Sequence, residues 1–374
     1  MQRIRVMHLI DGLGSGGAER MVVNLVNSLP RSRFQPVLCT SRFDGQLSAS
    51  VCQDVTRIRL NRRHRFDIAA ILRLAKAMRQ LNVRIIHAHS TSLFLAIAIR
   101  ALNRRVRVVW HDHYGPPAGL RRKTWVYGPA ARKADAVITV SETLVDWTHE
   151  RLHVPKSRVR YIPNFVCPAE HRSGVPELPG EPGARIACVA GIRAEKDLIS
   201  LVRAMELVVK RVPAAHLILI GPVHNAAYWQ EVQAEIASRS LARNITWLGE
   251  RNDIATLLSG CDIGVLSSRS EGFPVVLLEY GMARLATVST DVGQCSEVIE
   301  GGKAGILVSS EDPTALSAGL ISLLLSTERR RELGGRLAER VAHCYSAESV
   351  LGMVGNVYAQ VLESPESQSG LAAE

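Results

Sequence analysis

Two glutamates eight positions apart, Glu271 and Glu279, frame the stretch with the clearest signs of a binding site. The stretch follows an apolar run that ends near Ser268, typical of a buried strand, and it contains Gly272-Phe273-Pro274 before a second apolar run. Pro274 suits the first turn of a helix, where its missing N–H is no loss. The pattern predicts a strand, a tight loop and a helix whose free N–H groups hold an anion. Two carboxylates would repel a phosphate, so we expect them to bind sugar hydroxyls.

Two cations, Arg193 and Lys196, follow the strand expected over residues 185–191. An arginine fork close to a lysine point charge is suited to binding a diphosphate. The alternative is an ordinary solvated helix start. Because the Glu271 loop lies in the same half of the chain and also follows a strand, we favour the diphosphate.

Gly16 and Gly17 lie in a glycine-rich turn between a strand expected over residues 4–10 and a helix from Ala18 onward. Such a turn lets the backbone approach a phosphate or sugar closely. The spacing is not G-x-G-x-x-G with an acidic residue about 20 positions later, so a dinucleotide site is not expected. A purely structural turn is the alternative.

Two histidine pairs, His87/His89 and His111/His113, each end a strand of the first half. Alternation puts both members of a pair on one face. Four imidazoles are a candidate zinc set, but no H-E-x-x-H, acidic ligand pattern or D-x-D motif accompanies them, so we expect no metal. We expect His87 to be packed within its strand. His111 is expected to face the ligand cleft, where it can bond a hydroxyl or transfer a proton.

These residues fall at the ends of strands in two successive series of alternating strands and helices. The pattern predicts two parallel, doubly wound α/β domains over residues 1–165 and 184–345, with ligands at the carboxyl ends of their strands. A Pro- and Gly-rich linker is expected over 166–183. A helix over 346–362 is expected to pack back on the first domain, followed by a disordered tail over 363–374.

Seven scattered cysteines without a C-x-x-C pair argue against disulfides and a zinc site, and favour the reducing cytoplasm. No signal peptide is expected, and the longest apolar run is too short to span a membrane. The first 170 residues hold 28 Lys and Arg against 11 Asp and Glu, whereas the remainder carries net negative charge. This asymmetry predicts an anionic partner for the first half, for which we expect the inner membrane face. The three densest clusters are Arg62, Arg63 and Arg65; Arg104, Arg105 and Arg107; and Arg121, Arg122 and Lys123.

Together these motifs resemble the retaining glycosyltransferases of family 4, which have the GT-B fold of two facing Rossmann-like domains with a cleft between them. Glu271 and Glu279, with the intervening Gly272-Phe273-Pro274, match that family's E-x7-E signature. The resemblance implies that Glu271 contacts the donor sugar and that Glu279 holds ribose hydroxyls. It further implies a set of phosphate, base and catalytic contacts: the backbone at Gly272, Phe273, Pro274 and Val275, the cations Arg193 and Lys196, the cleft loop at Gly16 and Gly17, a base-pocket residue at Asn252, and the catalytic-region histidine at His111.

The sequence departs from the family pattern at three places near the signature. Tyr280 stands where a small residue usually follows the second glutamate, residues 283–288 (ARLATV) replace the common G-x-P-V, and Gln294 stands where relatives often have a glycine in D-V-G-G. These changes bear on the identity of the donor more than on activity.

The resemblance implies a metal-independent, retaining enzyme that moves a sugar from a nucleotide diphosphate sugar to an acceptor hydroxyl. We expect no cofactor, a sugar or lipid-linked acceptor, and a role in cell-surface polysaccharide or glycolipid synthesis. A sugar-nucleotide 2-epimerase of the same fold is the rival enzyme, and a degenerate sugar-binding scaffold is another alternative. A basic nucleic-acid-binding protein is a further one, but aromatic residues make up only 5% of the chain and no RNA-binding signature is present.

Overall fold

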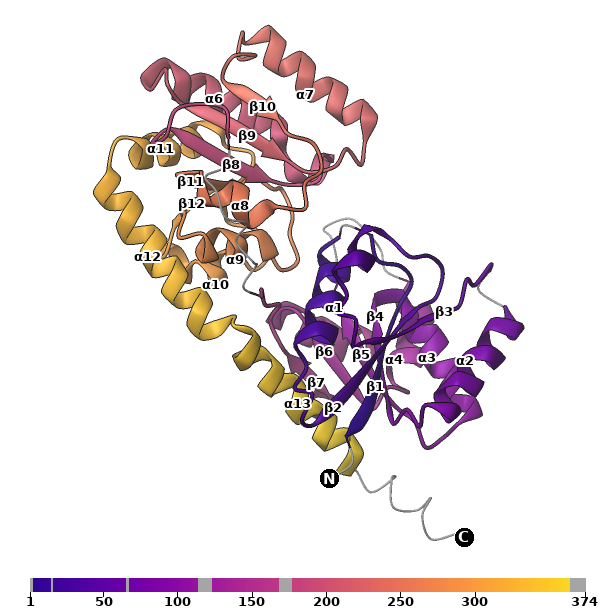
Figure 1. Ribbon diagram of the computed structural model, residues 1–374. Coiled ribbons are helices and arrows are strands. Elements are labelled where there is room, and N and C mark those ends of the chain that lie inside the picture. The colour runs from indigo at the N-terminus through magenta and orange to yellow at the C-terminus, as the bar shows by residue number, and fades with distance from the viewer. Residues whose placement is uncertain (1–2, 15, 65–66, 114–122, 168–176, 364–374) are drawn as a thin grey trace, which may run out of the picture. The chain divides into compact units, whose positions relative to one another are not determined.

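The computed structural model describes residues 3–14, 16–64, 67–113, 123–167 and 177–363 (Figure 1). The described residues form two compact units. Unit 1 contains the residues up to Cys167 together with the C-terminal helix α13 (Ala347–Glu363), and unit 2 contains residues 177 to Ser346. Residues 168–176 of the linker expected over 166–183, and the tail after Glu363, lie outside the described residues.

Unit 1 is built on a parallel sheet whose described strands are ordered β3-β2-β1-β4-β5-β6-β7. Its strands are β1 (Ile4–Ile10), β2 (Phe34–Thr40), β3 (Thr56–Arg59), β4 (Ile85–His89), β5 (Arg107–Asp112), β6 (Ala136–Thr139) and β7 (Val159–Tyr161). Its helices before α13 are α1 (Gly17–Ser28), α2 (Ile68–Gln80), α3 (Leu93–Leu102), α4 (Thr124–Ala131) and α5 (Glu142–Leu152), with short 3₁₀ turns η1 (Gln46–Ser50), η2 (Ser90–Ser92) and η3 (Lys156–Arg158). The chain leaves β1 toward β2 on one side and later continues with β4 on the other, so the order reverses between β1 and β4.

The two faces of this sheet carry separate apolar cores, because successive strand residues point to opposite sides. On one face, residues such as Leu9, Ile86 and Trp110 pack with α2 and α3. On the other face, Val6, Ile85 and Val109 pack with α1 and α13. Helix α13 supplies a stripe of buried residues at helical spacing: Val350, Leu351, Val354, Val357, Tyr358 and Val361.

Unit 2 repeats this architecture with a parallel sheet ordered β10-β9-β8-β11-β12-β13 in the described residues. Its strands are β8 (Arg185–Val189), β9 (His216–Ile220), β10 (Ile245–Trp247), β11 (Ile263–Leu266), β12 (Ala286–Thr290) and β13 (Ile306–Val308). Its helices are η4 (Ala194–Lys196), α6 (Leu198–Arg211), α7 (Ala226–Ser238), α8 (Ile254–Ser259), α9 (Val275–Met282), α10 (Cys295–Val298), η5 (Glu300–Gly302), α11 (Pro313–Leu324) and α12 (Thr327–Cys344). The strand order reverses between β8 and β11, which is where an open α/β sheet binds its ligand.

Two arginines from the basic clusters lie inside unit 1, contrary to the expectation of surface positions. The Arg62 side chain is 8% exposed and its Nη2 lies 3.3 Å from Oδ1 of Asp11. The Arg107 side chain is 5% exposed and its Nη1 lies 3.1 Å from Oδ1 of Asp135. A buried guanidinium is stable only when a carboxylate balances its charge, so the Arg62 and Arg107 side chains are held in internal ion pairs. Arg65, Arg121 and Arg122 lie outside the described residues.

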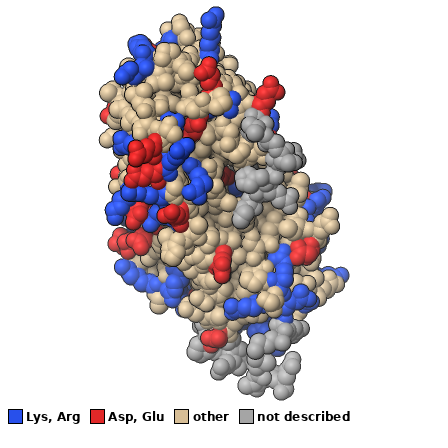
Figure 2. All heavy atoms as spheres, turned by 60° about the vertical axis from the view of Figure 1, so that its left-hand side comes forward, with Lys and Arg blue, Asp and Glu red and all other residues tan. Residues whose placement is uncertain are grey.

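The remaining charge is not continuous on the face drawn in Figure 2, where lysine and arginine side chains are interspersed with acidic and uncharged ones. Arg63, Arg104, Arg105 and Lys123 are exposed. No described helix is long and apolar enough to cross a membrane.

Candidate active site

The strands β8 and β11 end beside each other in unit 2 and leave a small pocket between the segments that follow them. Its lining includes Ala190 after β8, Lys196 at the end of η4, Ser267 and Ser268 after β11, and Val276 in the first turn of α9. The pocket therefore lies at the switch point of the sheet, with a cation and two hydroxyls at its wall.

Lys196 and Glu271 meet at this pocket. Lys196 Nζ lies 2.5 Å from Oε1 of Glu271, and Ser268 Oγ donates to the same oxygen at 2.6 Å. The side chains of Lys196 and Glu271 are 15% and 10% exposed. The carboxylate is held on one side by a cation and a hydroxyl, and its charge is balanced, so it can stand beside a phosphate without repelling it.

Hydrogen bonds to backbone carbonyls hold the segments after β8 and β11 in place. Ser267 Oγ donates to the carbonyl of Lys196 at 2.8 Å, and the Arg269 N–H donates to the carbonyl of Glu195 at 2.9 Å. On the far side of β11, Thr290 Oγ1 donates to the carbonyl of Ser268 at 2.7 Å. The Lys196–Glu271 contact is thus set by the sheet and not by a mobile loop.

The Gly272-Phe273-Pro274 turn leads into α9, whose first residue is Val275 and whose N-cap is Pro274. No side chain caps this end, but the Val275 and Leu277 N–H groups donate to the Phe273 and Pro274 carbonyls at 3.0 Å, so of these first N–H groups that of Val276 is available to an anion. Gly293 packs against the turn with φ of +57°, and a Cβ there would lie 2.3 Å from the carbonyl oxygen of Glu271. Only glycine permits this approach. The neighbouring Gln294 contributes its backbone N–H, which donates to the carbonyl of Gly272 at 3.2 Å.

The two residues after the first turn of α9 have different environments. Glu279 is partly exposed. Tyr280 is buried, its hydroxyl accepts from the Val189 N–H at 3.0 Å, and it lies within donating distance of the Ala187 and Val265 carbonyls. Burial raises the pKa of Tyr280 well above its usual value. The ring occupies the space beside Gly264, where a Cβ would lie 2.5 Å from it. Tyr280 therefore fastens α9 to β8 and β11, which gives this departure from the family pattern a structural reason.

Two further predicted donor residues lie on the surface of unit 2. Arg193 is the exposed N-cap of η4, three positions before Lys196, and no hydrogen bond or ion pair joins its side chain to another described residue. Asn252 is exposed between Arg251 and Asp253, which pair with each other at 2.7 Å. The structure brings Lys196 and Glu271 together but places neither Arg193 nor Asn252 in contact with them.

Gly16 and Gly17 belong to unit 1, where they open α1 after the carboxyl end of β1. Gly16 is the N-cap and Gly17 the first helical residue, and both are exposed. Space is open at Gly17, because a Cβ there would meet no atom within 4 Å.

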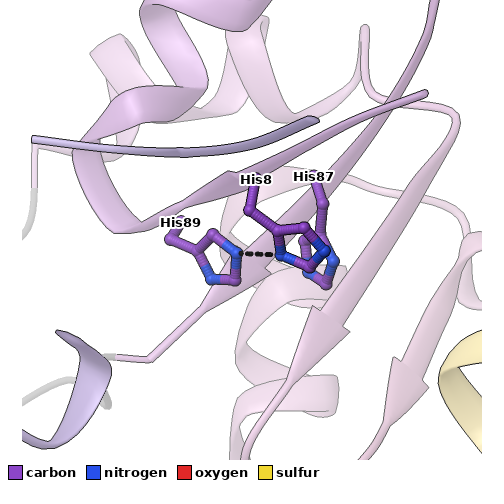
Figure 3. Close-up of side chains that lie close together, drawn as sticks. All are labelled: His8, His87 and His89. Carbon is purple, nitrogen blue, oxygen red and sulfur yellow. Dashed lines mark hydrogen bonds between the residues drawn. The ribbon is translucent and has the colours of Figure 1, made fainter. Parts of the chain in front are cut away.

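His111 is 2% exposed and its imidazole packs among other histidines, which differs from the expectation of a side chain open to substrate. Its Nδ1 lies 3.1 Å from Nε2 of His87. Burial, with a smaller contribution from His113, lowers the pKa of His111 well below its usual value, so the ring is neutral. The neighbouring His8 was missed in the sequence, because nothing local reveals that β1 pairs with β4 and places His8 beside His87 (Figure 3).

Comparisons with known proteins agree with the fold. Residues 176–340 match the family model of group 1 glycosyl transferases, and residues 15–170 match that of glycosyltransferase family 4. The chain is 24% identical over 317 residues to N-acetyl-alpha-D-glucosaminyl L-malate synthase of Bacillus anthracis, covering 81% of each chain. It is 26% identical over 251 residues to the lipopolysaccharide core biosynthesis mannosyltransferase LpcC of Rhizobium leguminosarum, covering 66% of this chain and 70% of that protein. Among solved structures, Anabaena HepE in complex with UDP superposes with a TM-score of 0.80 at 16% identity, covering 96% of this chain and all of that one.

The two Rossmann-like units define the GT-B fold, and the two family models together span most of the chain. The protein belongs to the family 4 glycosyltransferases, and it is a glycosyltransferase of the kind found in polysaccharide and glycolipid biosynthesis.

Proposed function

We propose that the enzyme transfers a sugar from a nucleoside diphosphate sugar to an acceptor hydroxyl with retention of configuration, and without a metal ion in the transfer. The observation that carries this proposal is the Lys196–Glu271 pair at the switch point of unit 2, beside the uncapped N-terminus of α9. A carboxylate for sugar hydroxyls and cationic groups for a diphosphate are the two requirements of such a donor.

Each group has a proposed role in donor binding. Glu271 accepts from hydroxyls of the donor sugar through the oxygen that Lys196 and Ser268 leave open. Lys196, the N–H groups that remain open at the N-terminus of α9, such as that of Val276, and the exposed Arg193 stabilise the charge that grows on the diphosphate as the glycosidic bond breaks. Glu279, partly exposed on α9, holds ribose hydroxyls, and Asn252 lines the base pocket.

The leaving diphosphate departs from the same face that the acceptor attacks, and its oxygens help to remove the acceptor proton. This route gives retention without a carboxylate nucleophile beneath the anomeric carbon. Gly16 and Gly17 open α1 in the acceptor-side unit, and the open space at Gly17 lets the backbone approach a sugar. The enzyme needs no cofactor beyond the nucleotide sugar.

The direct test is to incubate the protein with a panel of nucleotide sugars and to detect the released nucleoside diphosphate. UDP-sugars are tested first, because the structurally similar Anabaena HepE was solved in complex with UDP. Retention is read from the anomeric configuration of the product by NMR. Metal independence requires that Mg²⁺ or Mn²⁺ does not raise the activity of chelator-treated enzyme; restoration by either ion contradicts it.

The acceptor is proposed to be a lipid-linked sugar at the cytoplasmic leaflet, as the lipopolysaccharide core enzyme among the relatives suggests. In unit 1, α2 packs against α3 and α3 against α4, and four large apolar side chains of these helices are exposed: Ile68 (69%), Leu72 (55%), Leu102 (56%) and Trp125 (76%). Exposed cations lie on the same helices or directly beside them: Arg73, Lys76, Arg79, Arg104, Arg105 and Lys123.

This combination fits an anionic bilayer better than a soluble partner, because the cations attract acidic headgroups while the apolar side chains enter the interface. Ile68 and Leu72 are four residues apart and therefore share one face of α2. Each cation near an anionic surface contributes about 1 kcal/mol, so the six together suffice for reversible attachment.

A further inference from the structure

A row of five imidazoles, four of them buried and that of His113 partly buried, crosses the sheet of unit 1 where β1, β4 and β5 end. His8 on β1 lies opposite His87 on β4, and His89 on β4 lies opposite His111 on β5, so that all project from one face of the sheet. His113 follows β5 on the same face and stacks on His111 with ring centroids 4.0 Å apart. The row lies at the switch point of unit 1, where the strand order reverses.

The ring nitrogens of this row form two hydrogen-bonded chains. In the first, His8 Nδ1 lies 3.2 Å from His89 Nε2, and His89 Nδ1 lies 2.9 Å from His113 Nε2. In the second, the Tyr358 hydroxyl lies 2.6 Å from His87 Nδ1, and His87 Nε2 lies 3.1 Å from His111 Nδ1.

Three nitrogens at the ends of these chains have no partner within the part of the molecule that is described: His8 Nε2, His111 Nε2 and His113 Nδ1. A neutral imidazole carries one N–H and one lone pair, so each chain is left with unpaired polar atoms in a buried environment. A buried polar atom without a partner costs about 1 to 3 kcal/mol. Five imidazoles gathered at such a cost are unusual for a core that could have been apolar, and one of the three unpartnered nitrogens, that of His8, belongs to a group of three histidines close enough to share an ion.

We propose that His8, His87 and His89 bind one Zn²⁺ ion. One ring nitrogen of each lies within 4.8 Å of those of the other two (Figure 3). Two nitrogens bound at about 2.0 Å to one tetrahedral zinc are about 3.3 Å apart, which the His8 Nδ1 to His89 Nε2 distance of 3.2 Å already matches. For all three to bind, the rings must rotate to close the longer separations of up to 4.8 Å, and His87 Nε2 must exchange its contact with His111 Nδ1 for the ion.

The surroundings of two of the ligands favour the tautomers that zinc requires. His87 can donate its Nδ1–H to the Tyr358 oxygen, which leaves a lone pair on Nε2. His89 can donate its Nδ1–H to His113 Nε2, which likewise leaves a lone pair on its own Nε2. Metal-binding histidines regularly make such a second hydrogen bond.

The sequence predicted no metal, because it offered only two separated histidine pairs without a recognisable ligand spacing. The tertiary structure supplies His8 from a third strand and Tyr358 from α13. An ion at this triad joins β1 to β4 and, through Tyr358, to α13. It serves to stabilise unit 1 and takes no part in the chemistry proposed for unit 2.

The full-length protein, dialysed against a chelator and then against buffer, is titrated with ZnCl₂ alone. We expect one Zn²⁺ per chain by calorimetry and by elemental analysis after gel filtration, a rise in melting temperature, and tetrahedral absorption bands when Co²⁺ replaces Zn²⁺. His89→Ala should abolish stoichiometric binding. His343→Gln, which changes an exposed histidine of unit 2, should leave it unchanged.

Tyr358→Phe keeps the shape of the core and removes only the hydroxyl that orients His87. It should weaken Zn²⁺ binding by about tenfold or more, the usual effect of losing such an orienting group, even if His89→Ala fails to fold. Absence of stoichiometric Zn²⁺ binding by the wild-type protein, or equal affinity in the wild type and Tyr358→Phe, would overturn the proposal and leave the row as a hydrogen-bonded core filled by water.

Discussion

Lys196 and Glu271 are separated by 75 positions in the chain, yet the ammonium nitrogen of one lies 2.5 Å from a carboxylate oxygen of the other. The contact exists because β8 and β11 are neighbours in the sheet of unit 2. It places the only cation that lines the described pocket against the first glutamate of the family signature.

Lys196→Ala should lower turnover by about 10²- to 10³-fold, the usual loss when one group that stabilises transition-state charge is removed. The measurement is kcat for nucleoside diphosphate release. Lys210→Ala removes an exposed lysine that pairs with Glu206 on α6, and it serves as the matched control. Equal activity of the two variants would remove Lys196 from the mechanism.

Glu279→Gln should weaken nucleoside diphosphate binding by about 1 to 3 kcal/mol, because a charge-assisted hydrogen bond to ribose becomes a neutral one. Its melting temperature should not change, since the side chain is partly exposed. Affinity is measured by calorimetry beside Glu328→Gln, a change at an exposed glutamate of α12. Unaltered affinity in Glu279→Gln would rule out the ribose contact.

Tyr280→Phe should destabilise unit 2 by about 1 to 3 kcal/mol, because the buried Val189 N–H then loses the hydroxyl it donates to. Urea unfolding measures this loss. The Michaelis constant for the donor should stay close to that of the wild type at temperatures where the variant is folded. A large rise in that Michaelis constant with unchanged stability would mean that Tyr280 contacts the nucleotide sugar and does not serve to hold α9 against the sheet.

Unit 1 should lose stability as the pH falls below 6.5. Burial lowers the pKa of His8 and His113 from 6.5 to about 3, and it lowers those of His87, His89 and His111 well below 6.5. Below pH 6.5 the unfolded chain therefore binds protons that the folded chain does not yet bind. Each histidine then costs about 1.4 kcal/mol per pH unit in this window.

The measurement is urea unfolding at a series of pH values with chelator present, followed by pulsed hydrogen exchange of the β4 amides. His113→Gln removes one of the five groups and should reduce the slope of stability against pH by one proton. A wild-type slope of zero between about pH 6.5 and about pH 5 would contradict the neutral state of the row.

Ile68→Glu combined with Leu72→Glu should reduce binding to anionic vesicles by about tenfold or more, because two apolar side chains can no longer enter the interface. Both positions are exposed, so the melting temperature should hold. Vesicle sedimentation compares this variant with Leu325→Glu, an exposed apolar position of unit 2. Binding that is equal for anionic and neutral vesicles, or insensitive to salt, would argue for a soluble acceptor.

The sequence by itself determined those features that depend on neighbours along the chain. Alternating apolar residues of period two and helical stripes indicated two doubly wound α/β units, because burial of one face requires that spacing. The Gly272-Phe273-Pro274 turn and the α9 N-terminus after β11 could also be predicted, because the strand, the turn and the start of the helix lie within about a dozen residues of the chain.

Only the tertiary structure decided which strand ends lie side by side, since strand order is set by packing over the whole sheet and not by local pattern. That order joins Lys196 to Glu271, and it brings His8 from β1 to the histidines of β4. It also turns Arg62 and Arg107 inward to Asp11 and Asp135, because a carboxylate at the neighbouring position balances each buried charge. A count of charges along the chain could not separate these internal cations from those that remain in water.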